Sequence, residues 1–193
     1  MKKLSIILFI ALFTVLGSTA QNQNSLRVGL NGAFWGAGDV TGLVFYAEYE
    51  RTLTPYFALV PRLSSGYSSE HVKGTKEYWS EWSYSSILST HTASLSLRTT
   101  PFQKMSWLKL DAGFLYQHTI ISSINFYPDP TIGVAGVTAW DDHLFGILFA
   151  VNANIIETER HVFGLRGEML TYFDAGSFEC SGFQFGIYYG VRF

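Results

Sequence analysis

The 193-residue sequence has little charge, a single cysteine and, beyond its first 20 residues, no long apolar run. With Cys180 as the only cysteine, an intrachain disulfide is excluded. Charged residues make up 15 % of the chain and the formal net charge is −2, so there is no basic field of the kind that binds nucleic acid. An apolar run of about 18 residues is needed for a membrane-spanning helix, and none remains after residue 20.

The first 20 residues have the pattern of a cleaved signal peptide. Lys2 and Lys3 precede an apolar run, and Ser18 and Ala20 occupy the two small positions before a cleavage site. We therefore expect a signal peptide over 1–20 and one domain over 21–193. The high content of aromatic residues (17 %) suits a sheet with one apolar face. An exported chain of this composition is either a secreted β protein or an outer-membrane barrel.

Residues 183–193 alternate strictly between apolar and small or polar side chains. Phe183, Phe185 and Ile187 share one face with the terminal Phe193, whereas Gln184 lies on the other. Only a strand, with its side-chain period of two, separates residues in this way. Seven earlier segments show a similar alternation, at 26–35, 42–51, 56–67, 87–99, 107–119, 143–155 and 161–173. The connections at 53–55, 100–106 and 157–160 are short, whereas 68–84 and 120–142 are expected to be long loops, as in an up-and-down barrel.

The charges of these segments fall on the face opposite the apolar stripe. A charge that faces lipid is costly, so this sorting indicates lipid outside and polar groups inside. Unpaired backbone is not tolerated in lipid, so the sheet must close. We therefore predict an all-β fold, an eight-stranded antiparallel up-and-down transmembrane β-barrel, monomeric and without cofactors. Eight strands leave an interior that side chains can fill. The expected lumen network consists of Glu48, Glu50, Arg62, Arg98, Lys109, Asp111, Arg166 and Glu168.

The pattern resembles the small eight-stranded outer-membrane barrels of the OmpA/OmpX type, including the outer-membrane β-barrel proteins common in Bacteroidetes. The resemblance covers the whole mature chain and rests on topology, the signal peptide and the terminal Phe193. It implies the outer membrane of a Gram-negative bacterium, contact with lipids and lipopolysaccharide, and recognition of Phe193 by the barrel assembly machinery. It also implies a structural role or a surface-interaction role such as adhesion. The interfacial aromatic girdles are expected to include Trp35, Phe57, Tyr67, Trp107, Tyr116, Phe173 and Phe193.

A lipid A-modifying enzyme is the first alternative, because a few barrels of this size resemble lipid A deacylases or palmitoyl transferases. Ser89 and His91 lie on one segment and His118 on the next, all on the outward side. A histidine there could take the serine proton as a general base. However, no carboxylate is at hand on that face, and the spacing lacks the His-x-Ser pattern that we associate with the deacylases. Polar residues at the headgroup level are therefore the favoured interpretation.

Three further features of the sequence bear on function. The segment 68–84 contains a dense group of aromatic residues, and such exposed groups indicate a partner, a sugar or a lipid headgroup, with packing on the barrel rim as the alternative. This group consists of Tyr78, Trp79, Trp82 and Tyr84. The lumen charges could instead line a narrow pore for small solutes, which is the second alternative. Possible metal ligands match no known spacing, so we expect no metal: they are Glu70, His71, Asp141, Asp142 and His143.

Overall fold

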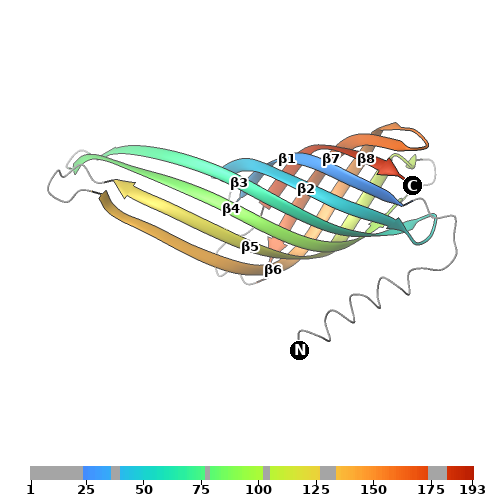
Figure 1. Cartoon of the computed structure of the whole chain (residues 1–193), viewed down its shortest axis with the longest axis horizontal. Helices are drawn as coiled ribbons and strands as arrows, with labels where there is room; N and C mark the ends of the chain where they lie inside the picture. The colour runs from blue at the N-terminus through green and yellow to red at the C-terminus, as the bar shows by residue number, and fades with distance from the viewer. Residues whose placement is uncertain (1–23, 36–39, 77–78, 102–104, 127–133, 174–181) are drawn as a thin grey trace, which may run out of the picture.

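The computed structural model describes residues 24–35, 40–76, 79–101, 105–126, 134–173 and 182–193. These residues form eight strands: β1 (Ser25–Trp35), β2 (Val40–Thr52), β3 (Phe57–Lys76), β4 (Trp79–Thr99), β5 (Leu108–Phe126), β6 (Val134–Glu157), β7 (His161–Tyr172) and β8 (Gly182–Arg192). Each strand pairs antiparallel with the next, and β8 pairs with β1, which closes the barrel (Figure 1). Among these residues, no helix is long and apolar enough to span a membrane.

The predicted eight-stranded antiparallel barrel is therefore confirmed. The closing pair runs from Ser25 opposite Arg192 to Trp35 opposite Gly182. Along β8, the aromatic and aliphatic side chains that share the face of Phe183 are exposed on the outside, whereas Gln184 and Tyr188 are buried inside. We call the end that carries the connections β2–β3, β4–β5 and β6–β7 the turn end. Of the three short connections predicted, those at 53–55 and 157–160 lie there, between adjacent strands, and the third, at 100–106, includes residues outside the described part of the chain.

The segments predicted as long loops are instead largely strand, and this prediction was wrong. β3, β4, β5 and β6 continue past the barrel as a four-stranded sheet, which Figure 1 shows as a blade reaching well beyond the other strands. We call this sheet the extension: residues 68–76, 79–88, 121–126 and 134–140. Its pairing is continuous from Ser68 opposite Leu88 to Gly74 opposite Trp82. A sheet that lies outside lipid does not need an apolar face. These strands accordingly lack the alternation that marks a membrane-crossing strand.

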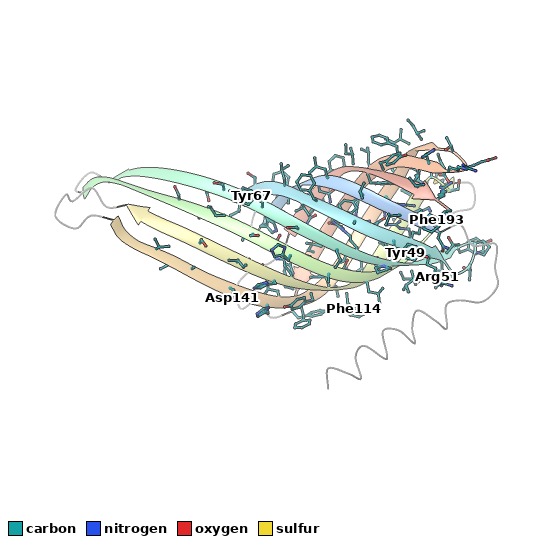
Figure 2. All side chains as sticks on the ribbon, in the orientation of Figure 1. Tyr49, Arg51, Tyr67, Phe114, Asp141 and Phe193 are labelled. Carbon is teal, nitrogen blue, oxygen red and sulfur yellow. The ribbon has the colours of Figure 1, made fainter. Side chains whose placement is uncertain are left out.

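One aromatic residue predicted for a girdle lies elsewhere. Trp35 is buried inside the barrel, where it packs with Ala33 and Val44. Successive side chains of a strand point to opposite faces. Because Phe34 takes the outward position on β1, the next residue must point inward. The other aromatic residues predicted for the girdles are exposed on the outer surface: Phe57, Tyr67, Trp107, Tyr116, Phe173 and Phe193. Figure 2 shows Tyr67, Phe114 and Phe193 among the side chains that project from the outside.

Candidate functional site

The barrel interior is filled by two kinds of side chain. Next to the extension lie apolar clusters, one around Trp35 and one that joins Leu115, Leu148 and Leu170 with Tyr172. Toward the turn end, the interior holds five cations and four carboxylates that contact one another. These are Arg27, Arg62, Arg98, Lys109 and Arg166 with Glu48, Glu50, Asp111 and Glu168. All eight residues of the expected network thus lie inside, together with Arg27.

Arg98 is the centre of the network. Its guanidinium donates to both Asp111 carboxylate oxygens, at 2.7 and 2.8 Å, and to Glu48 and Glu50 at 2.8 Å each. Lys109 donates to the other oxygen of Glu50 at 2.8 Å. Because charge-assisted bonds of this kind join β2, β4 and β5, they fix the strands across the lumen as well as along the sheet.

Arg166 is a second centre, on the opposite wall. It donates to Asp111 and Asn152 at 2.8 Å each and to Glu168 at 2.9 Å. Glu168 also pairs with Arg62, whose guanidinium lies 4.0 Å from the centre of the Tyr46 ring. Charges removed from water are stable only when they are paired in this way. The two centres share Asp111 and Glu48, so the network is continuous across the lumen.

The turn end opens into a small hollow of about 210 Å³. Its lining includes Glu50, Arg98 and Lys109 from the network, together with Arg192 and Glu157 from the rim. Arg192 pairs with Glu157 and also donates to the Thr158 carbonyl oxygen at 3.1 Å. The hollow therefore has the charged layer in its wall and the apolar clusters beyond that layer.

The proposed catalytic residues lie on the outer surface, but the structure does not join them into a relay. His91 and His118 are opposite one another on β4 and β5, with ring centres 6.5 Å apart. Ser89 is opposite Tyr67 and Ile120. In the described part of the chain, the Ser89 hydroxyl has no hydrogen bond to either histidine. The serine that contacts His91 is Ser65, with 3.2 Å between its Oγ and the His91 Nδ1.

A carboxylate does reach this face, contrary to the expectation from sequence. Asp141 Oδ2 lies 3.5 Å from His118 Nε2 and 3.8 Å from His143 Nε2. Sequence reasoning placed Asp141 in a loop and His143 at the start of the next strand, and grouped them with Glu70, His71 and Asp142. In the structure, Glu70 lies opposite Ser86, farther out on the extension, whereas His143 is opposite His118. The sequence does contain one signal for the pairing of Asp141 with His143. They are two residues apart, so both lie on one face if the segment is a strand.

The aromatic group at the far end of the extension is only partly within the described residues. Trp79, Trp82 and Tyr84 belong to β4, so they stand on a strand rather than in the predicted loop. Tyr78 lies outside the described residues. On the backbone, Trp82 is opposite Gly74, and Tyr84 is opposite Val72 on β3 and Asn125 on β5.

Comparison with known proteins identifies the fold. No protein-family model matches the chain, and no curated protein sequence matches it. Among solved structures, it resembles Ail, the attachment invasion locus protein of Yersinia pestis, with a TM-score of 0.60 and 8 % identity over 90 % of this chain and 100 % of that one. It also resembles a major outer membrane protein from Thermus thermophilus, with a TM-score of 0.57 and 14 % identity over 88 % of this chain and 99 % of that one. The fold is that of a small outer-membrane β-barrel.

Proposed function

We propose that the chain is an integral barrel of the bacterial outer membrane, and that it serves as a surface-interaction protein whose extension receives a strand from another protein. The observation that carries the proposal is the pairing pattern of β6. Its ladder with β7 begins at Gly146, opposite Tyr172, and Phe145 accepts a hydrogen bond from the Phe173 amide. In the described part of the chain, no strand pairs with residues 134–144 on that side.

The two edges of the extension differ in charge. The β3 edge, residues 68–76, contains Glu70, His71, Lys73 and Lys76, and charged side chains commonly protect a strand edge against pairing. The outer part of the β6 edge, residues 134–140, reads Val-Ala-Gly-Val-Thr-Ala-Trp and contains no charge, whereas Asp141 and Asp142 lie at the base of that edge, next to the barrel. An uncharged edge strand is the kind that takes up an extended segment of a partner through backbone hydrogen bonds. We therefore assign the docking edge to β6.

The packing of the interior supports an interaction role over transport. The lumen holds paired charges next to packed apolar side chains, whereas a conducting barrel needs water along its axis. The similarity to Ail adds support, since that protein is named for attachment and invasion. The exposed apolar belt around the barrel, which includes Phe114 and Phe145, would then contact membrane lipid and lipopolysaccharide.

Site-specific photo-crosslinking on intact cells tests this proposal. A crosslinking residue at Val137, which is 67 % exposed, should give a protein adduct, whereas one at the outward Phe149 in mid-barrel should not. Ala139→Lys places a charge on the β6 edge and should suppress the adduct, because strand addition would bury that charge. Ser69→Lys makes the same change on the β3 edge and should leave the adduct in place. Equal adducts at Val137 and Phe149, or equal suppression by both lysines, would contradict the assignment of the edge.

A further inference from the structure

Three histidines stand side by side where the extension leaves the barrel. His91 on β4 is opposite His118 on β5, which is opposite His143 on β6. The rings of His118 and His143 are stacked, with centres 4.6 Å apart and planes at 16°. The ring of His91 is farther away, at 6.5 Å from that of His118, and is tilted by 40°. The closely spaced pair is therefore His118 with His143.

A carboxylate completes the group. Asp141 lies two residues before His143 on the same face of β6, and Figure 2 labels it on that strand near the junction of barrel and extension. Its Oδ2 is 3.5 Å from Nε2 of His118 and 3.8 Å from Nε2 of His143, and one ligand atom from each of the three residues lies within 4.8 Å of the other two. Two imidazole rings and one carboxylate are thus grouped at the spacing of candidate metal ligands.

The hydrogen bonds around the group leave the Nε2 atoms of His118 and His143 available to bind an ion. The Tyr116 hydroxyl lies 2.7 Å from Nδ1 of His143. When that Nδ1–H donates to the tyrosine oxygen, the Nε2 lone pair points toward Asp141, and such an outer partner is what fixes the tautomer of a metal-binding histidine. The Nε2 atom of His118 is enclosed and has no hydrogen bond among the described residues. An enclosed nitrogen of this kind needs a partner.

We propose that His118, Asp141 and His143 bind one divalent transition-metal ion, such as Zn²⁺ or Cu²⁺. Imidazole and carboxylate ligands suit these ions, and metal–ligand bonds of about 2.0–2.2 Å place tetrahedral ligand atoms roughly 3.3–3.6 Å apart. The two separations from Asp141 are already close to that value, so side-chain rotation has only to bring the two histidine nitrogens together. Three protein ligands leave a fourth position for water or an external ligand. The ion would join β6 to β5 at the base of the extension.

A serine–histidine–acid relay fits the same residues less well. Ser65 contacts His91, whereas Asp141 contacts His118, so the acid and the serine belong to different histidines. In the part of the chain that the structure describes, no hydrogen bond connects His91 with His118. Because a relay needs one histidine between serine and acid, the geometry favours metal binding.

Zinc titration of the purified, untagged protein in detergent tests the site. We expect one Zn²⁺ per chain in competition with a fluorescent chelator, and at least a tenfold loss of affinity in each of His118→Gln, His143→Gln and Asp141→Asn. Two matched controls should bind as the wild type does. His91→Gln removes the third histidine of the row, and Asp142→Asn removes the neighbouring carboxylate on the other strand face, opposite Thr119.

A second readout does not depend on whether the variants fold. Cu²⁺ bound to the wild-type protein should show an electron paramagnetic resonance spectrum with coupling to two nitrogens. The proposal is overturned if the wild type binds no Zn²⁺ at a ratio of one to one, if the spectrum lacks coupling to two nitrogens, or if His91→Gln weakens binding as much as His118→Gln does.

Discussion

Arg98 and Asp111 face each other across β4 and β5 and are joined by two parallel hydrogen bonds, at 2.7 and 2.8 Å. Both side chains are almost fully buried. Such a bidentate pair has a fixed geometry. Because Arg98 also binds Glu48 and Glu50, one guanidinium contacts three buried carboxylates, which Arg27, Lys109 and Arg166 help to neutralise.

The first prediction follows from that relationship. Arg98→Ala leaves three buried carboxylates without their main partner, and removal of one member of a buried pair typically costs about 3–5 kcal/mol. We expect a loss of that size in the free energy of unfolding, measured by urea titration of the barrel in lipid vesicles. Arg192→Ala is the control, because its pair with Glu157 lies at the rim and should contribute about 1 kcal/mol or less. Equal losses in the two variants would show that the buried network has no special role.

The second prediction concerns conduction. The wild-type protein should show no steady single-channel conductance in planar bilayers, because paired charges and apolar clusters occupy its interior. A steady wild-type conductance that Arg98→Ala alters and Arg192→Ala does not would instead establish the narrow pore. This comparison separates a path through the network from leakage around the barrel.

The third prediction concerns the close contact between Gly29 and Tyr46. A Cβ at Gly29 would overlap the Tyr46 ring, and the Arg62 guanidinium packs over that ring, 4.0 Å from its centre. Gly29→Ala should therefore lower the free energy of unfolding by about 1–3 kcal/mol, the usual cost of overpacking. Gly32→Ala on the same strand is the matched control, since a Cβ there would lie 3.8 Å from the Phe185 carbonyl oxygen, an ordinary contact. Urea titration in lipid vesicles measures both variants, and a neutral Gly29→Ala would refute the tight contact.

Much of the barrel could be predicted from the sequence because lipid imposes a rule on every crossing strand. Phe183 and Phe185 must face out while Gln184 faces in, and the same parity places Arg98 and Glu168 in the lumen. The extension could not be predicted in this way. Residues such as Ser68, Ser69 and Glu70 carry no apolar alternation, and their strand conformation comes from pairing with β4.

The contact of Asp141 with His118 was not predicted, for the same reason, although Asp141 and His143 were both considered as metal ligands. That contact depends on β5 and β6 continuing as paired strands past the barrel, where Ile120 is opposite Asp141. Sequence spacing alone shows that His118 and Asp141 are 23 residues apart, on either side of a segment without regular alternation. The partners of the lumen charges were likewise beyond prediction. Parity shows which charges point inward, but only the barrel register shows that Arg166 reaches Asp111.

We infer that the barrel crosses the outer membrane and displays the extension outside the cell. Labelling with a membrane-impermeant maleimide tests it most directly, using single cysteines in a Cys180→Ser background. Val137→Cys on the extension should react on intact cells, Met105→Cys at the turn end should react only after the outer membrane is permeabilised, and Phe149→Cys in the apolar belt should react only after denaturation. Equal reaction at all three positions on intact cells, or reaction at Met105→Cys but not at Val137→Cys, would contradict the account.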